Sequence, residues 1–122
     1  MADILLVEDN PKQRADFEQA LTRAGHRVEA VASGNQALTR LKKGTYTILV
    51  TDLLMKEGTG FDVLYWVVLN APGMPILISS AFVQPDGFKD MLKAHPVRIL
   101  KKPFKLEVLV QQVKELVGEE EA

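Results

Sequence analysis

Residues 4–10 of the chain read ILLVEDN, a short apolar run that ends in two adjacent carboxylates. The four apolar residues are typical of a strand that is buried on both faces. Glu8 and Asp9 repel one another and lose hydration energy if they are buried, so their position at the end of such a strand needs an explanation. Either the strand reaches the surface at this point, or a positive charge lies beside the two acids.

Short apolar runs recur along the chain and alternate with patterns typical of helices. The runs that predict strands occupy residues 4–7, 27–32, 47–50, 75–79 and 97–100. Apolar residues spaced three and four apart predict helices over 11–24, around 37–41, over 61–70, between 85 and 96, and over 106–117. This alternation predicts an α/β domain in which five helices cover both faces of one parallel five-stranded sheet.

The composition of each run also predicts the strand order. Strands that are buried on both faces read as continuous apolar runs, whereas edge strands can alternate. The first, third and fourth runs are continuous, but the second alternates and the fifth contains Arg98. We therefore expect the doubly wound order 2-1-3-4-5, in which ligands bind beyond the carboxyl ends of the strands.

Polar side chains stand at these carboxyl ends. They are Glu8 and Asp9 after the first strand, Asp52 after the third, Ser80 after the fourth and Lys102 after the fifth. Three carboxylates in one pocket require a cation, and oxygen ligands without histidine or cysteine suit Mg²⁺. A hydroxyl and an ammonium group beside such an ion are what the oxygens of a phosphoryl group need. The pattern predicts a site for magnesium and a phosphoryl group.

Length and composition are those of one soluble domain. The chain has 122 residues and a formal net charge of −1, which gives no basic surface for nucleic acid. No apolar run approaches the roughly 20 residues that span a bilayer, and Asp3 and Glu8 interrupt any signal peptide. The absence of cysteine excludes disulfides and thiolate ligands. We expect a cytoplasmic domain over 1–118 and a solvated acidic tail over 119–122, with no nucleic-acid or membrane partner.

Four fragments of the sequence carry a resemblance to a known family. They read ILLVEDN (4–10), ILVTDLLM (48–55), PILISSA (75–81) and ILKKPF (99–104). In this order and at these separations, they resemble the receiver domain of two-component response regulators over essentially the whole chain. The resemblance implies a flavodoxin-like fold. It also implies a phosphoacceptor signalling domain, which is not an enzyme beyond catalysing its own phosphorylation and dephosphorylation.

The resemblance further implies a role for each carboxylate of the site. Asp52 would accept a phosphoryl group from the phosphohistidine of a histidine kinase or of a phosphotransfer protein. Asp9 would bind Mg²⁺ directly and Glu8 would assist through water. The backbone carbonyl of Leu54 would complete the protein ligands of the metal.

The remaining site residues would contact the phosphoryl group. Ser80 matches the hydroxyl that turns toward it, and Lys102 matches the lysine of the family, with a cis bond expected before Pro103. Strand alternation lets only one of Lys101 and Lys102 face the site, and the resemblance selects Lys102. Ile99 stands where the family usually has Tyr or Phe, so we expect no aromatic switch, and the stiff Ile99 side chain should pack or shift only in small steps.

The same residues argue against two other functions. A flavodoxin-type flavin site would need a hydroxyl- and glycine-rich loop where the chain has the acidic EDNPKQ (8–13), and a dehalogenase-type phosphatase would need an acid where the chain has Leu54. A degenerate receiver that acts as a phosphorylation-independent docking module remains the alternative. In the main interpretation, a downstream protein binds the surface of the fourth helix, fifth strand and fifth helix, and homodimerisation is left open.

Overall fold

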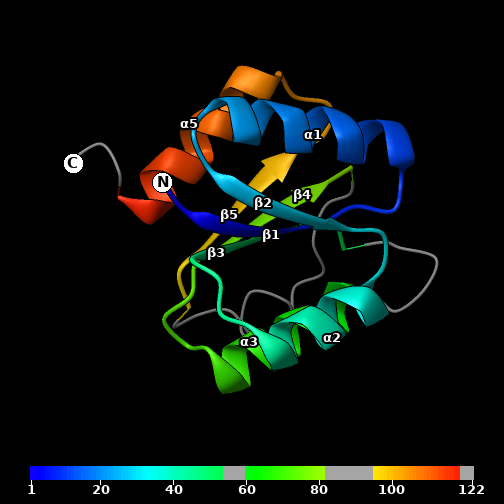
Figure 1. Cartoon of the computed structure of the whole chain (residues 1–122), viewed down its shortest axis with the longest axis vertical. Helices are drawn as coiled ribbons and strands as arrows, with labels where there is room; N and C mark the ends of the chain where they lie inside the picture. Colours follow the sequence, from blue (N-terminus) through cyan, green and yellow to red (C-terminus); the bar gives the residue numbers. More distant parts are fainter. Residues whose placement is uncertain (54–59, 82–94, 119–122) are drawn as a thin grey trace.

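The computed structural model describes residues 1–53, 60–81 and 95–118 (Figure 1). Its strands are β1 (Asp3–Val7), β2 (Arg27–Val31), β3 (Ile48–Thr51), β4 (Ile76–Ser80) and β5 (Val97–Lys101). The helices within the described residues are α1 (Pro11–Arg23), α2 (Gly34–Lys43), α3 (Gly60–Asn70) and α5 (Leu106–Val117). Most of the helix predicted between residues 85 and 96 falls on residues 82–94, outside the described part, and the acidic tail over 119–122 lies outside it as well.

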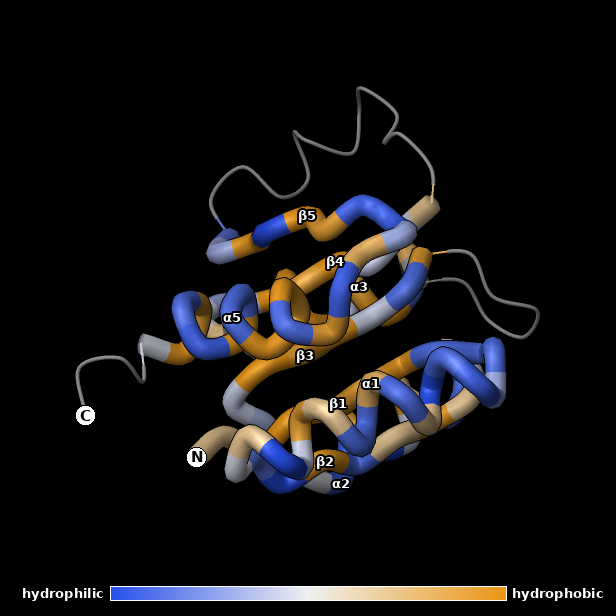
Figure 2. Tube along the Cα trace, turned by 90° about the horizontal axis from the view of Figure 1, so that it is seen from above, coloured by the Kyte–Doolittle hydropathy of each residue, from blue (hydrophilic) through white to orange (hydrophobic). Residues whose placement is uncertain are grey.

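The five strands form one parallel sheet in the order β2-β1-β3-β4-β5. This order confirms the prediction that the continuous apolar runs lie at the centre and the two polar runs at the edges. Figure 2 shows the difference, since β3 and the first part of β4 are hydrophobic whereas β5 contains hydrophilic segments. The central strands exclude water on both faces, and hence their polar carboxyl ends are the first points at which they can meet solvent or a ligand.

Helices cover both faces of the sheet (Figure 1). Helices α1 and α5 lie on one face, and α2 and α3 lie on the other. Side chains alternate along a strand, so that Ile4 and Leu6 of β1 pack toward α1 and α5. Leu5 and Val7 enter the second core, toward α2 and α3. The end of β1 is therefore held from both sides. None of the helices in the described ranges is long and apolar enough to cross a membrane.

Helix α1 begins immediately after the two acids that follow β1. Asn10 is the N-cap, and its Oδ1 accepts a hydrogen bond from the backbone N–H of Gln13 at 3.0 Å. Pro11 occupies the first turn, where its missing N–H costs nothing. The capping role therefore belongs to Asn10 and leaves the carboxylates of Glu8 and Asp9 available for other contacts.

A polar network joins α2 to the edge strand β2. The hydroxyl of Tyr46 donates to Glu29 Oε2 at 2.7 Å, and Arg40 Nη1 donates to the same oxygen at 2.6 Å. Burial, together with the hydrogen bond to Glu29 and its charge, raises the pKa of Tyr46 to about 12. The neutral phenol is therefore the form that stabilises the fold.

We expect the free energy of unfolding of Tyr46→Phe to fall less steeply at alkaline pH than that of the wild type. Since the folded pKa of Tyr46 lies above its ordinary value of 10.0, its contribution is complete below that pH and is lost as the pH rises toward 12. After allowance for solvent screening the contribution is about 1 kcal/mol. Denaturant unfolding should show Tyr46→Phe less stable than wild type at about pH 8, with a difference that narrows above pH 10. Tyr65, which is 55% exposed, provides the matched control Tyr65→Phe. A constant difference across this range would contradict the assignment.

Candidate functional site

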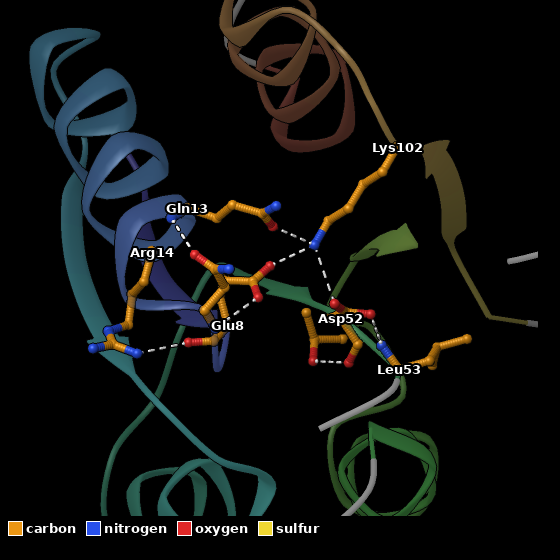
Figure 3. Close-up of polar contacts among 8 residues, drawn as sticks. Glu8, Gln13, Arg14, Asp52, Leu53 and Lys102 are labelled. Atoms are coloured by element: carbon orange, nitrogen blue, oxygen red, sulfur yellow. Dashed lines mark hydrogen bonds and ion pairs between the residues drawn. The ribbon is translucent and has the colours of Figure 1, made fainter. Parts of the chain in front are cut away.

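The carboxyl ends of three strands bring Glu8, Asp52 and Lys102 together (Figure 3). Glu8 follows β1, Asp52 follows β3 and Lys102 follows β5. The ammonium nitrogen of Lys102 lies 2.7 Å from Glu8 Oε1 and 3.1 Å from Asp52 Oδ2. Lys102 and Glu8 are 94 positions apart in sequence, so this contact depends on the sheet order.

The acids that end β1 and β3 form one cluster. Oxygen atoms of Glu8, Asp9 and Asp52 lie within 4.8 Å of one another. Glu8 is almost completely buried, at 1% exposure, while Asp9 and Asp52 are half-buried. The backbone N–H of Asn10 donates to Glu8 Oε2 at 3.1 Å, and Arg14 donates to the backbone carbonyl of Glu8 at 3.0 Å. These bonds hold Glu8 in place despite its burial.

The charge of this cluster fits a divalent metal ion. Three carboxylates stand against the single ammonium group of Lys102 in this set. Like charges this close raise the energy of the ionised state unless a cation compensates them. Oxygen donors with excess negative charge suit a hard ion such as Mg²⁺. The donor set is therefore able to hold a metal. The predicted fourth contributor, the carbonyl of Leu54, lies outside the described residues.

Lys102, rather than Lys101, faces the site. Lys101 is exposed, whereas Lys102 is half-buried and its peptide bond to Pro103 is cis, both as the sequence predicts. Burial lowers the pKa of Lys102, but the hydrogen bond to Glu8 and the charges of Asp52 and Glu8 outweigh it, so the pKa lies above its ordinary value. The side chain therefore carries a full positive charge at neutral pH.

Backbone contacts position the other two strand ends. Asp52 accepts a hydrogen bond at Oδ1 from the N–H of Leu53 at 2.7 Å, and its own N–H donates to the carbonyl of Val7 at 3.1 Å. Ser80 is 1% exposed at the end of β4, and its carbonyl accepts the N–H of Lys102 at 2.8 Å. The structure thus places Ser80 beside the lysine backbone. Whether its hydroxyl contacts a phosphoryl group stays a prediction.

Two residues of α1 join the site without having been predicted there. Gln13 Oε1 accepts a hydrogen bond from Lys102 Nζ at 2.7 Å, and the Phe17 ring centroid lies 5.8 Å from the same nitrogen. Phe17 also stacks on Phe104, with ring centroids 5.3 Å apart. The sequence signal was the spacing of Gln13 and Phe17, which puts both on one face of the helix. The sequence predicted Phe17 only as a core residue, and in the structure it does pack in the core as well.

The prediction that Ile99 packs is wrong. Its side chain is 44% exposed on the edge strand β5. Because nearly half of this side chain stays in contact with water, we expect truncation to cost less than the roughly 2–4 kcal/mol that a fully buried isoleucine would give. Ile99 has no ring, so it also cannot act as an aromatic switch.

Comparison with known proteins assigns the family. Residues 4–114 match the family model of the response regulator receiver domain. The chain belongs to this family, which confirms the family and the fold class predicted from the sequence. It is therefore a receiver domain of two-component signalling.

Relatives differ in how much of their length this chain covers. The response regulator receiver protein CpdR of Brucella abortus is 28% identical over 117 residues, which are 96% of this chain and 98% of CpdR. The transcriptional regulatory protein TcrA of Mycobacterium tuberculosis is 32% identical over 113 residues, which are 93% of this chain but 45% of TcrA. The chain thus spans nearly all of CpdR and less than half of TcrA.

A solved receiver domain has the same fold. It is the receiver domain of the sensor histidine kinase PA1611 from Pseudomonas aeruginosa PAO1, which holds a magnesium ion in its active-site cleft. It is 28% identical to this chain with a TM-score of 0.82, over 96% of this chain and 98% of that one.

Proposed function

We propose that this receiver domain accepts a phosphoryl group on Asp52 in a reaction that requires Mg²⁺. The observation that carries the proposal is the Lys102 ammonium group, held between Glu8 and Asp52 beside a third carboxylate. A carboxylate nucleophile next to a fixed cation is the arrangement that phosphoryl transfer needs, because catalysis of this reaction is mainly positioning and charge stabilisation. The magnesium ion in the PA1611 receiver domain supports the choice of metal.

Asp9, Asp52 and the backbone carbonyl of Leu54 would bind the ion directly, with Glu8 acting through water. When bound, the ion would offset the negative charge of the incoming phosphoryl oxygens. The burial of Glu8 agrees with an indirect role, since its carboxylate is already engaged by Lys102 and by the N–H of Asn10.

The chain's own residues perform the rest of the reaction. An oxygen of Asp52 attacks the phosphorus of a phosphohistidine in line, the phosphorus–nitrogen bond breaks, and the imidazole leaves with the electron pair and takes up a proton. Lys102 stabilises the charge on the transferred oxygens, and Ser80 donates a hydrogen bond to one of them. The acyl phosphate carries about −2 charge where the carboxylate carried −1, so the site gains about one negative charge.

We place the phosphodonor in a histidine kinase or a phosphotransfer protein, in the cytoplasm, with residues 1–118 as the functional domain. The output would pass to a protein partner through β5, α5 and the predicted fourth helix, which lies outside the described residues. A homodimer through that surface is an alternative output.

Intact-mass measurement tests the proposal. The protein should gain the mass of one phosphoryl group when incubated with acetyl phosphate and Mg²⁺, and none when EDTA removes the metal. Hydroxylamine should reverse the gain, because it cleaves acyl phosphates. No gain in the presence of Mg²⁺ would contradict the proposal and favour the phosphorylation-independent docking module.

We expect Asp9→Ala to weaken Mg²⁺ binding by at least about tenfold, since loss even of indirect metal contacts has effects of this size. Glu8→Gln should weaken it less, because Glu8 acts through water. Calorimetric titration measures both, and Asp62→Ala, at an exposed residue of α3, is the control. Equal affinity in wild type and Asp9→Ala would remove Asp9 from the ligand set.

A further inference from the structure

The ammonium group of Lys102 has one acceptor without a charge. Within the described residues it donates to Glu8 Oε1 at 2.7 Å, to Asp52 Oδ2 at 3.1 Å and to Gln13 Oε1 at 2.7 Å (Figure 3). An ammonium group has three N–H donors, so these contacts use its full capacity. Two of the acceptors are carboxylates that would also interact with a metal ion, Asp52 directly and Glu8 through water. The third, on Gln13, is a neutral carboxamide.

Helix α1 holds Gln13 in a defined place. Its backbone N–H is bound by the cap residue Asn10, so the start of the Gln13 side chain is fixed in the first turn. One turn later Phe17 covers the ammonium group from the same helix face, and it is supported by its stack on Phe104. On the side of α1, the Lys102 ammonium group is thus contacted by one amide oxygen and one aromatic ring, both held in place by their own neighbours.

A metal ion at the acidic cluster changes the surroundings of Lys102. The ion neutralises the carboxylates that now attract the ammonium group, and it repels that group directly. The Lys102 side chain is 14% exposed, so it has a path to solvent. It would gain conformational entropy if it moved out of the site. The Gln13 oxygen is unaffected by this neutralisation and continues to accept a hydrogen bond.

We propose that Gln13 is a positioning residue, which keeps the Lys102 ammonium group at the site while the carboxylates are engaged by metal and by the phosphoryl group. This inference rests on the proposed function, since it concerns the state in which Asp52 reacts. Gln13 itself contacts neither the metal nor the phosphoryl group. It acts through Lys102.

Phosphorylation kinetics provide the first test, with Gln13→Met as the variant because methionine has a similar length and no strong acceptor. Gln19→Met, at an exposed residue of the same helix, is the control. At saturating acetyl phosphate and Mg²⁺, Gln13→Met should lower the labelling rate by about tenfold, the value of one charge-assisted hydrogen bond, and Gln19→Met should not. A small phosphodonor excludes effects on the docking of a kinase.

A double-mutant cycle separates positioning from general structural damage. In a Lys102→Ala background, Gln13→Met should have no further effect on the labelling rate, because the group that Gln13 positions is gone. Equal losses in the presence and absence of Lys102 would overturn the inference, as would an unchanged rate in Gln13→Met.

The second test does not depend on phosphorylation. The Lys102 ammonium signal in ¹H–¹⁵N spectra, identified by its loss in Lys102→Ala, should exchange slowly with water in wild type and persist when Mg²⁺ is added. In Gln13→Met its exchange should be faster, and Mg²⁺ should abolish the signal. Identical exchange in wild type and Gln13→Met, or no slowly exchanging signal in wild type, would overturn the inference. A wild-type protein that gives the expected spectra but takes up no phosphoryl group would contradict the proposed function alone.

Discussion

Replacing Asp52 with asparagine is expected to reduce phosphoryl labelling by at least about 100-fold, because an amide oxygen is a poor nucleophile and no carboxylate remains at this strand end. The asparagine side chain has the same shape, and its oxygen can still accept the N–H of Leu53, which binds Asp52 Oδ1 at 2.7 Å. The intact-mass measurement with acetyl phosphate and Mg²⁺ determines the loss.

The stability of the variant shows whether the loss is chemical. Asp52→Asn weakens one contact with Lys102 but also relieves repulsion among the three carboxylates, so the free energy of unfolding should change by no more than about 1 kcal/mol. Asp62→Asn, on the exposed face of α3, should label like wild type. Full labelling of Asp52→Asn would place the acceptor at another residue.

Replacing Lys102 with alanine should reduce both stability and labelling. Glu8 is 1% exposed, and the ammonium group 2.7 Å away is its ion-pair partner, so the variant leaves a buried carboxylate without that cation. Breaking a buried ion pair from one side costs about 3 kcal/mol or more in the free energy of unfolding. The labelling rate should fall by about 100-fold, as for the loss of a charge-stabilising group in other transfer reactions.

Lys101→Ala is the matched control for Lys102→Ala. Lys101 is exposed, so its removal should change the free energy of unfolding by less than about 0.5 kcal/mol. Millimolar Mg²⁺ should restore part of the stability lost in Lys102→Ala, since the ion replaces the missing positive charge. Denaturant unfolding in Mg²⁺ and in EDTA measures this recovery. Equal stability of the two lysine variants in EDTA would show that Glu8 does not need the ammonium group.

The sequence predicted the sheet and the convergence of the site for one physical reason. In a parallel sheet all carboxyl ends meet at one edge, so the polar residues after continuous apolar runs had to lie together. Glu8, Asp52 and Lys102 are joined as this argument requires. The alternating run of β2 and the arginine in β5 likewise placed these strands at the edges.

Features that depend on individual side-chain conformations were not predictable in this way. The contact of Gln13 with Lys102 requires a particular conformation of two long side chains, which periodicity does not specify. The exposure of Ile99 depends on what covers the edge strand, and its apolar character alone suggested burial. The near-complete burial of Glu8 was also unexpected, because a pattern at a strand end indicates position and not depth.

The backbone hydrogen bond from Lys102 to Ser80 has a mechanical consequence. It links the last residue of β4 to the residue that follows β5, so the backbone itself joins the carboxyl ends of these two strands. We expect a displacement of Ser80 to shift the backbone of Lys102 through this hydrogen bond, with no side chain between them. Ile99 lies exposed on the same edge strand, shortly before Lys102. We therefore expect a change at the carboxyl ends of the central strands to reach the edge strand β5 through the backbone.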